Sequence, residues 1–534
     1  MRRVPALAAL LAALAAAGCG GCGGDRGGPP PERFLPPDVA VALVLPEAGR
    51  AAEALAALHA TASTFPGTGD LAAARGALAA QLGFDPLDPD ALAGGGLDPR
   101  RGAAAALVAP PSGPRRALLV LPAADPPRLE SLLGRLARER LGAAVRSSEA
   151  RGGASVVVLR TAVGAPAALA YALVERYALV SAGPDGPAVV GAAASLTPER
   201  ALAALPAFVA ARRALGEEAA LCFLPPGSPA LAGLAPLREG VGVGVTAEEG
   251  ALRVRVAALA LERAGSLRAL GGSGAAAKLA LRLAPGATLV LRWDGDPAAL
   301  ARQVLPLVPA RDRAWLAGRG FDLETDLVPV LAPGAAAALS VAPGLELAGL
   351  SARSVRTDPL AMVTFEAVLP VRDVALAEEA AAKLERALRR GPSPPRDGVH
   401  AASTPSGTLA WTVDRERGRA VAAGGPPGQL DALRARLAGD GDGFTPPSAA
   451  ARAVLDGGLG GAVLDVPRLV SSVRALPPSA FGGGPSGFVV RSVVNRFVEP
   501  AERLLTVSLR ADLADDALLV TVEVEARPRA GAAR

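Results

Sequence analysis

The sequence predicts an α+β protein of two tandem, duplicated domains, each a mainly antiparallel sheet with helices packed on one face. Three observations lead to this class. A set of motifs occurs twice in the same order, each half contains an amphipathic helix, and each half closes with strand-like runs that alternate apolar and polar residues. Apolar residues make up 51% of the 534 residues, so the chain can form more than one core.

The duplication is clearest at the start of each half. The segment LPPDVAVALVL begins at Leu35, and LAPGATLVLRW begins 248 residues later at Leu283. Gly-Phe-Asp ends at Asp85 and again at Asp322, and Gly-Ala-Ala-Ala-Ala-Leu also occurs in both halves. Preserved order argues against chance similarity between Ala-rich segments. The period is too long for a solenoid, so two domains are expected.

Further elements follow the same order in both halves. Apolar residues at helical spacing predict helices, and short β-branched runs predict strands. The alternating runs at the end of each half predict hairpins with one buried and one solvated face. The predicted helices span 51–59, 127–141, 297–307 and 374–389, and the predicted strands span 155–159, 177–182, 408–413 and 419–423, with closing hairpins at 241–257 and 505–524.

These patterns set the predicted boundaries. A Gly/Ser/Ala-rich stretch separates the halves and is predicted to be a linker. The predicted organisation is a signal peptide over 1–18, a flexible Gly/Pro tether over 19–33, repeat 1 over 34–264, the linker over 265–277, repeat 2 over 278–528 and a tail over 529–534.

The N-terminal residues predict an export signal. Arg2 and Arg3 precede an apolar run to Ala17, which is too short to span a bilayer. Ala16-Ala17-Gly18-Cys19 resembles the lipobox of bacterial lipoproteins, in which the signal is cut before the cysteine and its sulfur carries a diacylglycerol. The resemblance implies that Cys19 is a lipid attachment site. An ordinary cleaved signal and a metal-binding pair with Cys22 are the alternatives, but zinc sites need further Cys or His ligands.

The charge and hydropathy of the chain limit the kinds of partner that it is expected to bind. The formal net charge is +5, with arginines and carboxylates interleaved, so no concentrated patch for nucleic acid is expected. Two uncharged stretches, 219–237 and 327–345, are broken by prolines and are predicted to be buried strands and turns. Cys222 lies in an apolar run and is expected to be a free buried thiol, although a bridge to Cys22 stays open.

The chain offers little that is typical of catalysis. His59 and His400 are its two histidines and occupy different places in the halves, so a shared histidine site is not expected. The sequence has no Gly-x-Ser-x-Gly and no phosphate-binding loop. The nearest serine motifs, at 271–275 and 484–488, are interpreted as linkers. We therefore expect a non-enzyme without a cofactor.

Acidic clusters recur at equivalent places of the two halves. Clustered carboxylates can bind calcium or act as an acid–base pair. Asp and Pro also mark helix starts, and capping is the favoured interpretation. The calcium candidates are Asp85, Asp88, Asp90, Asp322 and Asp326. The Gly-Asp segment at 439–443 is too short for an EF-hand loop and is predicted to be a turn.

Together these features predict an exported, membrane-anchored envelope lipoprotein with a binding or structural role. The expected location is the outer membrane, facing the periplasm or the cell surface. The body is similar to uncharacterised exported bacterial proteins, through Leu-Pro-x-Asp followed by a strand and a helix, and this resemblance implies no activity. A periplasmic carrier or chaperone for a hydrophobic ligand and a carboxylate-based hydrolase are the alternatives. The expected partners are the membrane, through the N-terminal lipid, and envelope proteins or a hydrophobic ligand.

Overall fold

The fold is described from a computed structural model. Several predicted features lie outside the described residues: the signal peptide, Cys19, Cys22, most of the tether, His59, most of the 265–277 linker, the 439–442 turn and the tail. The structure describes residues 29–52, 88–109, 114–231, 239–248, 250–259, 276–298, 310–341, 363–388, 398–404, 407–426, 443–476, 484–514 and 517–527, with positions 54, 76, 77, 79, 80, 85, 301, 305, 431 and 435–437 between them.

The chain divides into two compact units. Unit 1 is Met1–Ala264 with Ala514–Thr521, and unit 2 is Gly265–Leu513 with Val522–Arg534. The division therefore passes through the last strand, β19. The nineteen described strands belong to one antiparallel sheet.

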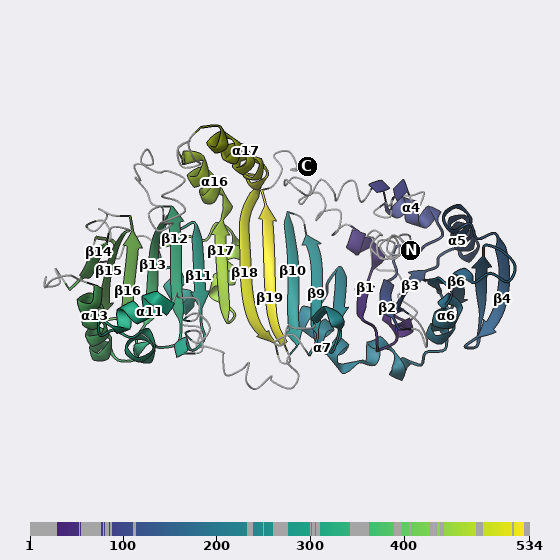
Figure 1. The fold of residues 1–534 in the computed structure, drawn as a ribbon, viewed down its shortest axis with the longest axis horizontal. Helices are drawn as coiled ribbons and strands as arrows, with labels where there is room; N and C mark the ends of the chain where they lie inside the picture. The colour runs from purple at the N-terminus through teal and green to yellow at the C-terminus, as the bar shows by residue number, and fades with distance from the viewer. Residues whose placement is uncertain are drawn as a thin grey trace. The chain divides into compact units, whose positions relative to one another are not determined.

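Unit 1 contains ten strands of its own and mostly short helices (Figure 1). Its elements are η1 Pro31–Phe34, β1 Val41–Leu45, α4 Pro89–Gly94, β2 Ala103–Val108, β3 Arg116–Pro122, α5 Pro126–Leu141, β4 Val145–Arg151, β5 Ala154–Arg160, β6 Ala167–Val174, β7 Tyr177–Ala182, α6 Gly186–Ala194, η2 Pro198–Arg200, η3 Leu202–Ala204, α7 Pro206–Leu215, β8 Ala220–Leu224, η4 Pro229–Leu231, β9 Val241–Glu248 and β10 Ala251–Leu259.

Unit 2 contains the remaining strands and two longer helices, α13 and α17. Its elements are α9 Ala276–Ala280, β11 Leu289–Trp293, α11 Ala310–Ala317, η7 Leu323–Leu327, η8 Val328–Val330, β12 Ala335–Val341, β13 Val363–Pro370, α13 Val374–Leu388, β14 His400–Thr404, β15 Gly407–Asp414, β16 Arg419–Gly425, α15 Ala449–Asp456, β17 Gly460–Asp465, α16 Val466–Ala475, α17 Gly484–Ala501, β18 Leu504–Ala514 and β19 Ala517–Ala526.

Both units use the same strand order. In unit 1 the antiparallel order is β4-β5-β6-β7-β3-β2-β1-β8-β9-β10. In unit 2 it is β14-β15-β16-β13-β12-β11-β17-β18-β19. The repeated motifs occupy matching strands, since β1 and β11 begin 248 residues apart and β3 and β13 end 248 residues apart. Among the described strands, β4 has no counterpart in unit 2.

Helix α5 shows how local sequence sets an element. The Asp125 side chain accepts the backbone N–H of Arg128 at 3.1 Å and caps the helix, and prolines fill the first turn. Leu129 and Leu132 lie one turn apart and face the sheet. Gly142 ends the helix in the left-handed region, at φ 66°, which glycine adopts without steric cost.

Helices cover both faces of the unit 1 sheet. On one face, Val120 of β3 belongs to a core with Val190 of α6 and Phe208 of α7. On the other face, its neighbour Leu119 belongs to a core with Leu129 of α5. All five side chains are fully buried. Adjacent residues of one strand point to opposite faces, so two cores are present.

Unit 2 is also covered on both faces. Val290 of β11 shares a core with Leu455 of α15 and Ala280 of α9. Trp411 of β15 packs with Ala381 of α13 in a separate core. The helices α9 and α15 therefore belong to one core and α13 to the other.

The predicted fold class is wrong in two respects. The strands belong to one antiparallel sheet and not to two separate sheets, and helices cover both faces and not one. Successive residues of β2 and β3 are buried, as in strands enclosed on both sides. The alternation used for the prediction belongs to the closing hairpin strands and does not extend to these central strands.

The two uncharged stretches do contain strands and turns. The first holds β8 and η4, and the second holds η8 and β12. Among the described residues, no helix is both long enough and apolar enough to cross a bilayer.

Candidate functional site

The described chain begins where the predicted tether meets unit 1. Phe34 and Leu35 are fully buried, and the Phe34 ring lies 5.4 Å from the Tyr177 ring. The Tyr177 hydroxyl donates to the Pro29 carbonyl oxygen at 3.0 Å, and burial raises the pKa of Tyr177 to about 12. The N-terminal segment is therefore fixed to unit 1 from Pro29 onward, ten residues after Cys19.

The charged side chains Glu32 and Arg33 of this docked segment both have partners. Glu32 is 1% exposed and forms an ion pair with Arg212 of α7. The Arg33 guanidinium donates to the Leu196 carbonyl oxygen. Paired charges and buried aromatic rings hold η1 against the body.

A cavity of about 540 Å³ lies beside this segment in unit 1. Its lining is strongly charged, and one of its ion pairs, Arg101 with Asp98, is 3.3 Å long. Such a lining favours a polar occupant over an apolar one. The charged lining residues are Arg50, Arg100, Arg101, Arg176, Arg212, Glu32, Glu47, Asp98, Glu217 and Glu218.

Glu218 lines this cavity, and its carboxyl group has a shifted pKa. Its side chain is 1% exposed, and burial raises its pKa. The carboxylate accepts the Thr246 hydroxyl of β9 and lies 3.2 Å from the Arg255 guanidinium of β10. A Cβ at Gly244 would lie 2.4 Å from the Glu218 Cγ, so glycine is required beside it. These contacts give Glu218 a structural role between strands.

The acidic residues of repeat 1 lie at the start of α4. The Asp88 side chain caps α4 and accepts the backbone N–H of Asp90 at 3.0 Å. The Asp85 carbonyl accepts the Asp88 N–H at 3.1 Å. Asp88 and Asp90 are exposed, as capping residues usually are.

The acidic residues of repeat 2 form a cap around η7. The Asp322 side chain accepts the N–H of Glu324 at 2.8 Å and of Thr325 at 3.0 Å. The Asp326 carboxylate accepts the Asp322 N–H at 2.8 Å and the Lys383 ammonium at 3.2 Å, and these partners lower the pKa of Asp326. Within the described residues, no three His, Cys, Asp or Glu side chains are placed to hold a metal ion.

His400 and Cys222 occupy strands. The His400 ring is hydrogen-bonded to Glu385 and stacks on Trp411 with centroids 5.8 Å apart. The Trp411 indole N–H donates to the Ala381 carbonyl at 3.2 Å, which ties β15 to α13. Cys222 lies on β8 as a free, half-buried thiol, and burial raises its pKa.

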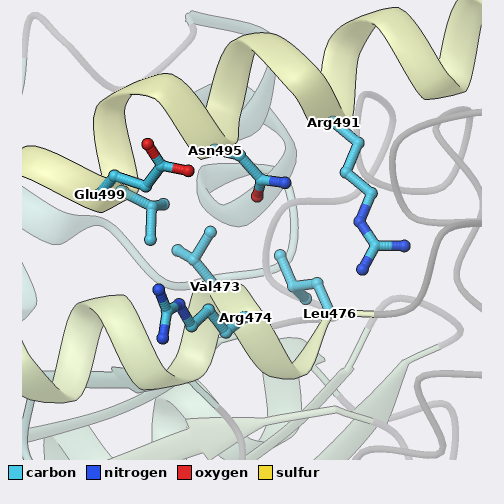
Figure 2. A pocket seen from close by; sticks show the side chains of 7 residues that line it. Val473, Arg474, Leu476, Arg491, Asn495 and Glu499 are labelled. Carbon is cyan, nitrogen blue, oxygen red and sulfur yellow. The ribbon is translucent and has the colours of Figure 1, made fainter.

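A second cavity, of about 330 Å³, lies between α16 and α17 in unit 2. Figure 2 shows Asn495, Arg491 and Glu499 on the side of α17 that faces α16, with Val473 and Arg474 on the opposite wall. An ion pair between the Arg474 and Glu502 side chains connects α16 to the residue that follows α17.

The outer side of α17 is apolar. Val489, Val490, Val493 and Phe497 are between 45% and 60% exposed. Phe488 is 76% exposed and, at helical spacing from Arg491 and Asn495, does not belong to this side. Sequence reasoning missed this helix because Gly484-Pro-Ser-Gly was interpreted as a linker. The signal that could have found it is the spacing of four residues from Val489 to Val493 to Phe497.

Comparisons with known proteins give little. No family model matches the chain, and no curated protein matches it. One solved structure, described as "Structure of crystal form III of TP0453", aligns over 43% of this chain and 79% of that chain at 10% identity, with a TM-score of 0.23. A likeness this low supports no conclusion on fold or function.

Proposed function

We propose that this protein is a non-catalytic, lipid-anchored lipoprotein of the cell envelope with a binding or structural role. Cys19 is its lipid attachment site, and the outer membrane is its expected location, with the body facing the periplasm or the cell surface. The observation that carries the proposal is Ala16-Ala17-Gly18-Cys19 directly after a short apolar run with two leading arginines.

The docked segment of unit 1 supports this arrangement. Pro29, where the Tyr177 hydroxyl fixes the chain, lies only ten positions after Cys19. A fully extended chain of this length spans about 35 Å. A lipid on Cys19 would therefore keep the start of unit 1 within about 35 Å of the membrane.

The described cavities favour neither alternative function. A carrier of hydrophobic ligands needs a mainly apolar pocket, whereas the unit 1 cavity is lined by arginines and carboxylates. A carboxylate hydrolase needs acids that converge with raised pKa values. Asp88 and Asp322 instead cap helices, and the pKa of Asp326 is lowered.

The test is metabolic labelling with a palmitate analogue in a bacterial host. The wild-type chain should be labelled, and Cys19→Ala should abolish the label. The matched control is Cys22→Ala, which removes the neighbouring cysteine and should leave the label intact. An unlabelled wild-type chain, or a label that follows Cys22, would refute the proposal. Crosslinking of the labelled chain in cells would then identify envelope partners.

A further inference from the structure

Helix α17 presents an exposed apolar surface to solvent. We define its apolar stripe as Val489, Val490, Val493 and Phe497, whose exposed fractions are 60%, 45%, 48% and 48%. Side chains of this type are normally buried, and a contiguous exposed group of them marks an interaction surface.

The two sides of α17 differ in chemistry. Asn495 and Glu499 lie on the side that faces α16 (Figure 2), and Val498 is 7% exposed. Helical periodicity places Val493 and Phe497 on the opposite side. The apolar stripe therefore points away from α16, so α16 does not cover it.

One arginine borders the apolar stripe. Arg496 is exposed, follows Val493 by three residues and directly precedes Phe497. It makes no ion pair with another described residue, whereas Arg474 of α16 is paired with Glu502. Arg491 instead lines the cavity on the side that faces α16 (Figure 2). An apolar stripe beside an unpaired arginine is complementary to an anionic lipid surface, where apolar side chains enter the acyl boundary and cations meet phosphates.

We propose that α17 is an interfacial membrane-binding helix, which lies in the plane of an anionic lipid surface with its apolar stripe inserted. The polar side, with Asn495 and Glu499, faces the rest of unit 2. This contact is separate from the lipid on Cys19 and does not require it. Each arginine near an anionic surface adds attraction that salt weakens.

A local fluorescence measurement tests the proposal. The full chain carries Cys19→Ala, Cys22→Ala and Cys222→Ser, so it has no lipid site and no native thiol. Val493→Cys is then labelled with an environment-sensitive fluorophore, and Ser492→Cys, on the polar side of α17, is the matched position. The N-terminal apolar run is present in both chains, so a difference between them reports α17.

Vesicles of phosphatidylethanolamine and phosphatidylglycerol should shift the emission at position 493 to the blue and leave position 492 nearly unchanged. Phosphatidylcholine vesicles should give a smaller shift. No shift at 493, or equal shifts at both positions, would overturn the proposal. A shift without vesicles that grows with protein concentration would overturn it as well, because a second copy would then cover the stripe.

Charge variants test the electrostatic part. Arg496→Gln should reduce the shift on anionic vesicles toward the level seen on phosphatidylcholine. The matched control is Arg138→Gln, an exposed arginine of α5, which should leave the shift unchanged. Equal loss in both variants would show a general charge effect and contradict a site on α17.

Discussion

The buried ion pair of Arg292 and Asp294 allows the sharpest stability prediction. Arg292 lies on β11 and Asp294 directly follows that strand, and their side chains are 0% and 2% exposed. The Arg292 guanidinium also donates to the Gly458 carbonyl at 3.0 Å, and burial lowers its pKa. Asp294 accepts the Ala276 N–H at 2.9 Å. We predict that Asp294→Ala strongly destabilises unit 2.

The expected magnitude follows from the groups left behind. The substitution leaves a buried guanidinium without its counterion and removes the acceptor of the Ala276 N–H. Breaking a buried pair from one side costs about 3–5 kcal/mol. For a domain of this size, 1 kcal/mol lowers the melting temperature by about 2–4 °C. A loss of about 4 kcal/mol therefore corresponds to roughly 8–16 °C.

The assay is urea and thermal unfolding followed by circular dichroism, with Arg292→Met and the double variant as partners. Removing both charges should cost much less than the sum of the single losses, because no isolated charge stays buried. A loss below about 1 kcal/mol for Asp294→Ala, which is typical of exposed pairs, would refute the reasoning. Additive losses would also refute it.

Three further predictions concern packing and pH. Leu129→Ala on α5 should cost about 2–5 kcal/mol in thermal unfolding because Leu129 is fully buried, and a loss below this range would contradict its core position. Gly461→Ala should cost roughly 1–3 kcal/mol, because its Cβ would lie 2.6 Å from the Val454 carbonyl oxygen, while Gly286→Ala, with open space around its Cβ, is the control. The Asp322 N–H and the Lys383 ammonium lower the pKa of Asp326 in the folded state, so this carboxylate stabilises the fold above its usual pKa and the contribution is lost as the pH falls through that range. Asp326→Asn should flatten the acid limb of the stability–pH curve, and an unchanged limb would contradict the assignment.

Local features were predictable from the sequence. The predicted helix over 127–141 corresponds to α5, Pro126–Leu141, and the one over 374–389 corresponds to α13, Val374–Leu388. Both helices are indicated by apolar residues at helical spacing and by an Asp just before the first turn. These two indications lie within one short segment of the sequence, so they can be found without the structure. The closing hairpin of repeat 1 is present as β9 and β10, with Glu248 paired to Ala251.

The arrangement of the sheet was less predictable. A run such as Ala-Ala-Ala-Ala-Leu-Val in β2 is apolar at every position, so it does not show which face is covered. The strand β1 is paired to β8 across about 180 residues, and such a pairing has no local signature. The single sheet and the helices on both of its faces could therefore be recognised only from the structure.

The candidate sites also differ in how far they could be predicted from the sequence. The Cys19 motif is contiguous, so a lipid attachment site could be proposed from the sequence alone. Arg292 lies within an apolar strand, and its burial depends on carbonyl groups about 165 residues away. The apolar stripe of α17 depends on which side of the helix α16 covers, and Gly484-Pro-Ser-Gly concealed the start of that helix.

Lipid attachment at Cys19 is tested most directly by mass spectrometry of the N-terminal peptide of the protein extracted from bacterial membranes. We expect the mature chain to begin at Cys19 and this residue to carry the mass of a diacylglycerol. A chain that begins at another residue with an unmodified thiol, or one that retains Met1, would contradict the claim.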